Sequence, residues 1–532
     1  MNFSDELNFA LALLPALLMS AAALWAWRSR APVARMWQQF NRLAFVALGF
    51  SLVGLVTQLI LVPAYGNGEA AAGSWLAANQ FGAWVSLLVQ LLGATIGVYS
   101  VHHLKGEPRQ PVYIASLAAV LAAVHVLLLA NHWVVLIAAW AAIEYAMHYL
   151  LCFYQDRPFA LLAAHKKKVT DRAADLLLII AAALAWSDVG SGSLSALWAV
   201  IAAGHSSAAL VWSSICLVLA VIARTALMPV QGWLIQVMEA PTPVSALLHA
   251  GVVNLGGYVL VLFAPLLGVS LFARWLLVVF GLVSAMVAGL VLLTRVSQKV
   301  HLAWSTIAQM GFMLLECGLG LYLFAALHLL GHSLYKAHNF LNASSVVQES
   351  NRKLMTGEAR NSGFSMIVAL PVAMVIVFTL RSFMDTHAWP WWWSAVLAIA
   401  WAPLLWVPRM EPGHSRPIFA RLGTALAMAV FLTVVAGIVD RAPIGAGIDP
   451  LAGAGVFAML GMAAMYVGMT VFQLWPQSVV TIRRWVYAGF YMDEGYTHWV
   501  LRLWPTHWAG AGHVAAPLSH ILQEPTCGRS DS

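Results

Sequence analysis

The stretch that decides the fold is Ile215-Cys-Leu-Val-Leu-Ala-Val-Ile-Ala-Arg-Thr-Ala-Leu-Met-Pro-Val-Gln-Gly-Trp-Leu234, a long apolar run that carries Arg224 and then Pro229. A helix needs about 20 apolar residues to cross the roughly 30 Å hydrocarbon core of a bilayer. Proline interrupts a helix, and broken membrane helices with a nearby charge are typical of ion sites in transporters. The stretch therefore predicts a broken transmembrane helix with Arg224 near its middle. An arginine that only reaches back to the membrane surface is the alternative.

The same apolar character extends over most of the chain. Of 532 residues, 61% are hydrophobic and only 9% are charged, whereas a soluble protein carries about 25% charged residues. Helices satisfy the backbone polar groups where water is absent. We therefore predict an all-α integral membrane protein with about fifteen spans, at 8–27, 43–63, 79–101, 111–130, 132–154, 173–188, 206–228, 243–265, 272–294, 301–320, 322–347, 364–384, 389–407, 418–439 and 451–475.

The basic residues predict the orientation of these spans. If the N-terminus lies outside, the loops that follow odd-numbered spans are cytoplasmic, and positive charges collect on that side of a membrane. The 28 Lys and Arg residues all fall in those loops or in the C-terminal tail, except Arg274, Arg381 and Arg441 outside and Arg224 and Lys336 within spans. The net charge of +7 therefore reflects membrane topology and gives no indication of nucleic-acid binding. A bacterial inner membrane, with a cytoplasmic C-terminus, is the predicted location.

The cysteines and the nucleotide motifs exclude several classes of chemistry. Cys152, Cys216, Cys317 and Cys527 are far apart, without the close Cys/His spacing of a zinc or iron–sulfur site. The chain has no Walker motif and no GxGxxG before a helix. We therefore expect no catalytic site, no metal and no cofactor in this chain, and its energy source should be an ion gradient or a partner.

Ionisable residues inside the spans are the candidate functional groups, because charges there are costly and usually mark an ion route or a buried pair. In Trp140-Ala-Ala-Ile-Glu-Tyr-Ala-Met-His148, Glu144 and His148 lie four residues apart and share one helix face. A carboxylate in a proton relay is the favoured interpretation. A protonated Glu144 bonded to His148 is the alternative.

The span at 322–347 has the densest polar pattern. His328, His332 and Lys336 recur every four residues and form one stripe. Such a stripe offers groups that can exchange protons near neutral pH. Ordinary interior histidines are one alternative. A metal bound by the HxxxH pair is another, although no carboxylate or cysteine stands at helical spacing beside it. His249 adds a further buried titratable group in the segment after Glu239.

The order of these motifs resembles the proton-translocating antiporter-like subunits, namely subunit L of respiratory complex I and the large subunit of Mrp cation/proton antiporters. The resemblance rests on Arg224 through Pro229-Val-Gln-Gly-Trp-Leu to Ala240-Pro-Thr-Pro-Val-Ser-Ala-Leu-Leu-His249-Ala, on Trp304-Ser-Thr-Ile-Ala-Gln309, and on the stripe from His328 to Lys336. It implies two inverted five-helix repeats, with a broken helix in each half and a polar axis between them. It also implies that Arg224 stands at the broken-helix lysine, Lys299 at the bridging lysine, and His328, His332 and Lys336 at the central relay.

The chain departs from the family at four points. The glutamate lies one turn later, at Glu144, and Arg224 replaces a lysine that could lose its proton. If this site functions, we expect a fixed charge whose pairing with Glu144 switches. The second half-channel lacks its expected lysine, because the span with Pro371 carries only Arg381, near its end. The tail is short, with one amphipathic segment from Arg483 to Trp508.

With the run Met238-Glu-Ala-Pro-Thr-Pro243, the displaced Glu144, Arg224 and the short tail, the chain most resembles the DabB membrane subunits of inorganic-carbon accumulating complexes. That resemblance implies a membrane subunit that conducts a cation, with the proton as the expected one, and that has no catalysis of its own. Its partner would be a large soluble DabA-like subunit on the cytoplasmic side, with a zinc site like that of carbonic anhydrase. A cation/proton antiporter subunit of the Mrp or complex I type is the alternative. A non-conducting membrane scaffold for an enzyme is a third reading.

The predicted organisation has four parts. Residues 1–110 form N-terminal transmembrane helices, and 111–360 form the antiporter-like core. Residues 361–476 form divergent C-terminal transmembrane helices, and 477–532 form a cytoplasmic amphipathic tail. The run His165-Lys-Lys-Lys168 is expected to be a solvated basic loop, which is the usual role of a charge cluster. A docking site for the partner, at this run or at the segment from Arg483 to Trp508, is the alternative.

Overall fold

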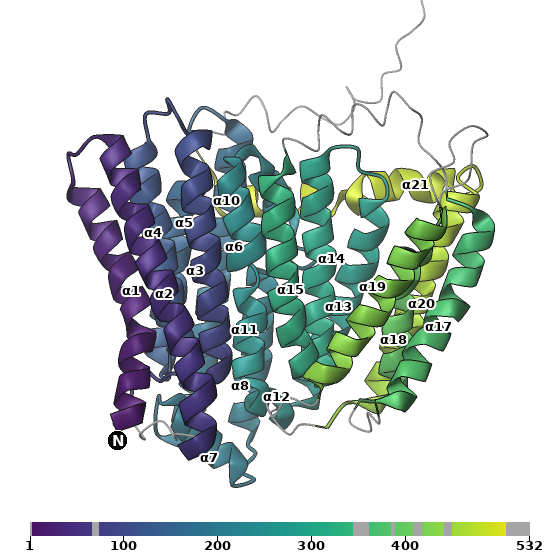
Figure 1. The fold of residues 1–532 in the computed structure, drawn as a ribbon, viewed down its shortest axis with the longest axis horizontal. Coiled ribbons are helices and arrows are strands. Elements are labelled where there is room, and N and C mark those ends of the chain that lie inside the picture. The colour runs from purple at the N-terminus through teal and green to yellow at the C-terminus, as the bar shows by residue number, and fades with distance from the viewer. Residues whose placement is uncertain are drawn as a thin grey trace, which may run out of the picture.

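The computed structural model describes residues 3–65, 74–343, 361–384, 389–407, 418–440 and 449–506. These residues form a bundle of roughly parallel helices that follow chain order from α1 at one end to α17 and α20 at the other (Figure 1). In the described part, 11 helices are long and apolar enough to cross a membrane, and two shorter apolar helices accompany them. The predicted all-α membrane fold is confirmed, although fewer helices than the predicted fifteen or so meet these criteria of length and composition.

The helices of the first part of the bundle are α1 (Phe3–Arg28), α2 (Val33–Tyr65), α3 (Gln80–His103), α4 (Gln110–Leu128), α5 (Trp133–Leu151), α6 (Pro158–Val189), α7 (Leu194–Ala202), α8 (Ala208–Arg224), α9 (Gly232–Gln236), η1 (Val237–Glu239), α10 (Thr242–Leu247), η2 (Leu248–Val252), α11 (Leu255–Leu262) and α12 (Ala264–Val269). The remaining helices are α13 (Leu271–Leu292), α14 (Gln298–Leu319), α15 (Tyr322–Leu341), α17 (Gly363–Phe383), α18 (Trp391–Trp401), η3 (Ala402–Leu405), α19 (Ile418–Val439), α20 (Ala452–Leu474), α21 (Val480–Tyr487), η4 (Gly489–Tyr491) and α22 (Met492–Leu503).

Helix α6 is much longer than the predicted span at 173–188, because it begins at Pro158. The expected solvated loop at 165–168 is therefore wrong for Lys166 and Lys167, which are 0% and 4% exposed on the first half of this helix. Lys168 is exposed. The lysines lower the local hydropathy and therefore predicted a solvent-exposed segment, but two of them face the protein interior.

The predicted break after Arg224 is confirmed. Helix α8 ends at Arg224, and the chain leaves the helical conformation before α9 begins at Gly232. Ala226 has a φ of 53°, and Pro229 cannot donate a backbone hydrogen bond. The freed N–H of Met228 donates to Ser284 Oγ of α13 at 3.1 Å. A neighbouring helix thus satisfies backbone that the break exposes, as the absence of water requires.

The expected break in the second half is not present. Helix α17 runs from Gly363 to Phe383 with Pro371 inside it, and Arg381 near its end donates to the backbone oxygen of Trp389 at 2.9 Å. A proline alone therefore did not break this helix. Among the described residues, the first half has the discontinuous helix that the family resemblance implied for both halves, and α17 in the second half is continuous.

The C-terminal segment runs across one end of the bundle instead of crossing it. Figure 1 shows α21 at the upper end, on the same side as α10 and opposite α7 and the start of α1. Helix α21 packs against α13, and α22 packs against α6 and α9. The predicted amphipathic segment from Arg483 is thus two short helices docked on the chain's own core. Its predicted end, Trp508, lies outside the described residues.

Candidate cation route

The first group of buried charges joins α5 to α6. The Glu144 carboxylate pairs with the Lys167 ammonium, and both side chains are more than nine-tenths buried. Lys167 also donates to Asp171 Oδ2 at 2.7 Å, and its ammonium lies 5.2 Å from the centre of the Trp233 ring. The alternative in which a protonated Glu144 bonds to His148 is not what the structure shows, because Glu144 pairs with Lys167 and His148 Nε2 lies 3.8 Å from the sulfur of Cys152.

Arg224 joins the same group from the broken end of α8. Its guanidinium pairs with Asp175, which also accepts from Arg172 at 2.8 Å, and it lies 4.4 Å from the centre of the Trp140 ring. In this structure Arg224 pairs with Asp175 and Glu144 pairs with Lys167, so the expected switching pairing of Arg224 with Glu144 stays a prediction. Its Nε and Nη1 atoms are buried without a hydrogen-bond partner among the described residues. We call Glu144, Lys167, Asp171, Asp175 and Arg224 the first ionic cluster.

Three members of this cluster were not among the site residues predicted from the sequence. Lys167, Asp171 and Asp175 recur every four residues and therefore share one face of α6. That spacing was a usable signal. The run of lysines nevertheless favoured a solvated surface, because such a run more often marks a solvated surface than an intramembrane face.

A second row of polar side chains follows α15. His328 Nδ1 lies 2.9 Å from Glu316 Oε2, its Nε2 lies 2.9 Å from Gln309 Oε1, and its ring centre lies 6.0 Å from that of His332. Lys336, fully buried, donates to the Leu302 backbone oxygen at 2.9 Å and to the Ser305 hydroxyl. We call Glu316, His328, His332, His249 and Lys336 the central polar row. The predicted stripe is thus present, and α14 adds a carboxylate that the spacing on α15 could not reveal.

His249 reaches this row from η2, a π-helix inside the span at Thr242–Leu262. Such π-helical turns are frequent at functional sites. His249 Nδ1 lies 3.0 Å from Thr306 Oγ1, and its ring stacks on Phe340 with centres 4.6 Å apart. The Nε2 atoms of His249 and His332 and the Oδ1 atom of Asn254 are buried without a partner among the described residues. Buried polar atoms of this kind usually bind ordered water.

Lys299 lies apart from both groups. It stands in the first turn of α14 and interacts electrostatically with Glu239 and Arg157. Arg157 in turn donates to the backbone oxygen of Glu239 at 2.9 Å. The structure therefore places Lys299 beside Glu239, near the end of the bundle, and the bridging role implied by the family resemblance stays a prediction.

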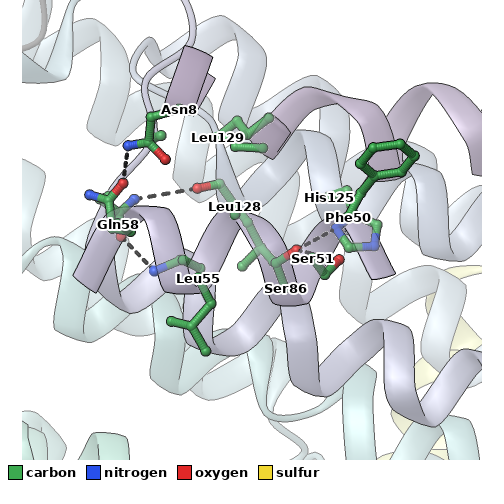
Figure 2. Close-up of a pocket in the computed structure, with 15 residues that line it drawn as sticks. Asn8, Phe50, Ser51, Leu55, Gln58, Ser86, His125, Leu128 and Leu129 are labelled. Atoms are coloured by element: carbon green, nitrogen blue, oxygen red, sulfur yellow. Dashed lines mark hydrogen bonds between the residues drawn. The ribbon is translucent and has the colours of Figure 1, made fainter. Parts of the chain in front are cut away.

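A separate polar pocket lies among the N-terminal helices (Figure 2). His125 lies 3.1 Å from Ser86 Oγ and 2.9 Å from Gln90 Oε1, and Asn8 donates to Gln58 across the pocket. The cavity measures about 30 Å³, which is room for two or three water molecules at about 10–15 Å³ each. In the part of the chain that the structure describes, no group of three or more His, Cys, Asp and Glu side chains could hold a metal ion.

The broken helix and the buried charges define a class of protein, the antiporter-like membrane subunits. Residues 130–390 match the family described as NADH:quinone oxidoreductase/Mrp antiporter. The fold resembles a chain of the Mrp complex from Dietzia, with a TM-score of 0.59 at 21% identity over 99% of this chain and 64% of that one. NADH-quinone oxidoreductase subunit L of Mycobacterium tuberculosis is 34% identical over 49% of this chain and 42% of its own length.

Within that class, the chain belongs to the DabB family of probable inorganic carbon transporter subunits. It is 35% identical to the DabB subunit of Hydrogenovibrio crunogenus over 87% of this chain and 90% of that protein. It is 32% identical to the DabB2 subunit of Halothiobacillus neapolitanus over 95% of each chain. The resemblance inferred from the sequence motifs is therefore confirmed.

Proposed function

We propose that this chain is the proton-conducting membrane subunit of an inorganic-carbon accumulating complex. The observation that carries the proposal is the match to DabB subunits along nearly the whole chain. The buried first ionic cluster and central polar row supply groups that could carry protons. The proposed location is a bacterial inner membrane with the N-terminus outside and the C-terminus in the cytoplasm.

The first ionic cluster suggests how the departure at Arg224 is accommodated. A guanidinium stays protonated under all ordinary conditions, whereas a buried lysine can release its proton. Lys167 stands between Glu144 and Asp171, and Arg224 holds Asp175 nearby. In this proposal, Lys167 is the titratable cation and Arg224 is the fixed charge. The pairing that switches is then that of Lys167 with Glu144.

The central polar row would carry the proton onward. Its members provide alternating donors and acceptors from Glu316 through His328 and His332 towards Lys336, with His249 beside them. Polar atoms without protein partners provide sites for connecting waters. Lys299, near Glu239, is proposed as an entry group at the end of the bundle.

The chemistry on inorganic carbon is assigned to a partner. A large soluble DabA-like subunit on the cytoplasmic side would hold a zinc site like that of carbonic anhydrase and convert CO2 to bicarbonate. Proton movement through this chain would make that conversion one-way. This chain itself is proposed to carry no catalytic site, metal or cofactor.

Substitution of Lys336 by Ala tests the proton path. His338→Gln is the matched control, because His338 is a polar residue on the same helix but is exposed. Cells that produce Lys336→Ala should lose bicarbonate accumulation although the complex still assembles, and cells with His338→Gln should keep it. Full accumulation in the Lys336→Ala strain, with the variant present in the membrane, would rule out this path.

The family match and the Mrp-like fold favour a second candidate, a cation/proton antiporter subunit. Purification of the tagged chain in mild detergent from its own membrane distinguishes the two. A large soluble partner with about one zinc per complex, as in the zinc sites of carbonic anhydrases, supports the inorganic-carbon proposal. Small membrane partners without zinc, together with sodium or potassium exchange in vesicles, support the antiporter.

A further inference from the structure

The C-terminal helix α22 contributes a charged residue at the edge of the first ionic cluster. Asp493, in the first turn of α22, pairs with the ammonium of Lys166 on α6. Its second carboxylate oxygen accepts from the Gln236 side chain at 3.0 Å. Asp493 thus joins α6, which carries the cluster, to α9, the short helix that follows the break.

The contact is closely packed on the α9 side. A side chain at Gly232, the first residue of α9, would overlap the Asp493 carboxylate and come within 2.9 Å of the Lys166 ammonium. Gly232 is therefore needed for the close approach of α22 to the broken helix. A movement of α22 would release α9 as well as Lys166.

The charge balance of this region depends on Asp493. Lys166 is fully buried and lies next to Lys167 in sequence. The number of basic side chains in these ion pairs equals the number of carboxylates only when Asp493 is included. The basic residues are Lys166, Lys167, Arg172 and Arg224, and the acidic residues are Glu144, Asp171, Asp175 and Asp493. Without the Asp493 carboxylate, Lys166 would keep its place beside the titratable pair but would lose its ion-pair partner, and a buried cation without a partner is an expensive state.

Other contacts hold α22 in the same position. The Tyr496 hydroxyl bonds to the Thr170 hydroxyl and donates to the backbone oxygen of Lys166 at 3.2 Å, and Lys166 donates to Thr497 Oγ1 at 2.8 Å. Burial raises the pKa of Tyr496 to about 12, so its hydroxyl stays protonated and can donate. Val500 is fully buried one turn later.

We propose that Asp493 is a positioning residue of the cation route, and that α22 docks and undocks in step with the charge state of the first ionic cluster. This inference rests on the proposed cation route and adds a control point to it. Because coupling between two sites is reciprocal, a loss of charge at Asp493 should change proton movement. A change of charge in the cluster should equally loosen α22.

The test uses the full chain with its native cysteines replaced by Ser and Val500→Cys as a reporter. The docked α22 shields this thiol. Asp493→Asn should raise its rate of labelling by a water-soluble maleimide at least about tenfold, because charged hydrogen bonds contribute enough for such a shift. Glu494→Gln is the matched control, since Glu494 is the exposed neighbour on the same turn. It should leave the rate unchanged, and Asp493→Glu should restore most of the shielding.

Proton flux in proteoliposomes gives the second readout. Asp493→Asn should shift the pH profile of the flux, and Glu494→Gln should not. Equal labelling in Asp493→Asn and the parent overturns the proposal, and so does faster labelling with an unchanged flux profile, which would leave α22 a structural anchor only. If Asp493→Asn fails to fold, Lys166→Gln with Asp493→Asn replaces it, because that pair leaves no lone ammonium. The labelling needs no transport, so an absence of flux in the parent would count against the proposed function alone.

Discussion

Lys167 sits between two carboxylates, and its position gives a clear order of effects at the scale of single residues. Glu144 and Asp171 both pair with it, and all three side chains are more than nine-tenths buried. A buried ion pair is weak support for stability as a whole. The removal of one partner is nevertheless costly, because the other charge stays buried without compensation.

Lys167→Met should therefore destabilise the protein by about 3–5 kcal/mol, and Glu144→Gln should cost less, because Lys167 keeps Asp171. The double variant should cost less than the sum of the two, by about 0.5–3 kcal/mol. Apparent Tm values in one detergent give the order. Additive effects would contradict the direct pairing of Glu144 with Lys167.

Glu316 supplies the carboxylate that the central polar row needs at His328. Glu316→Gln keeps a polar side chain next to His328, but an amide cannot take up and release a proton as a carboxylate can. We expect proton flux in proteoliposomes to fall by about a hundredfold, the usual size of a lost proton-transfer group, with little change in the amount of folded protein. Gln309→Glu places a new carboxylate at the other ring nitrogen of His328, Nε2. It should restore part of the flux in the Glu316→Gln background, and no rescue would argue against a relay at His328.

At the scale of elements, the break between α8 and α9 depends on α13. Ser284 is fully buried and accepts from the Met228 N–H, a backbone group that the break leaves without a helical partner. The packing thus stabilises the break, because the neighbouring helix α13 supplies a hydrogen bond that α8 has lost.

Ser284→Ala should destabilise the protein by about 1–3 kcal/mol, because it leaves a buried N–H unsatisfied. Ser213→Ala is the control. Ser213 is equally buried, but it donates to the backbone oxygen of Ala181, inside helix α6. The Ala181 oxygen still accepts its hydrogen bond within helix α6, so the loss of the Ser213 hydroxyl should cost little stability. Thermal unfolding of both variants in detergent checks this, and equal effects would show that Met228 gains nothing from Ser284.

At the scale of the whole molecule, the ends of the bundle differ in charge and in structure. The α3–α4 connection and the C-terminal helices lie at one end, and the α7 region lies at the other (Figure 1). The basic loops predict that the first of these ends faces the cytoplasm.

Cysteines at two exposed positions test this orientation. With the native cysteines replaced, Lys105→Cys should react with a membrane-impermeant maleimide only in inside-out vesicles. Ser206→Cys should react only in intact cells or right-side-out vesicles. Reaction of both from the same side would contradict the arrangement of the bundle, and the reverse pattern would invert the proposed topology.

The sequence by itself determined the membrane class, the break after Arg224, the stripe from His328 to Lys336 and the family, because hydropathy, proline chemistry and helical spacing are local properties. Only the tertiary structure decided which charges meet. It paired Lys167 with Glu144 and Arg224 with Asp175, brought Glu316 to His328, and placed Asp493 against Lys166, 327 residues away in sequence. Burial and pairing of a charge depend on how separate helices pack, and no spacing within one helix contains that information.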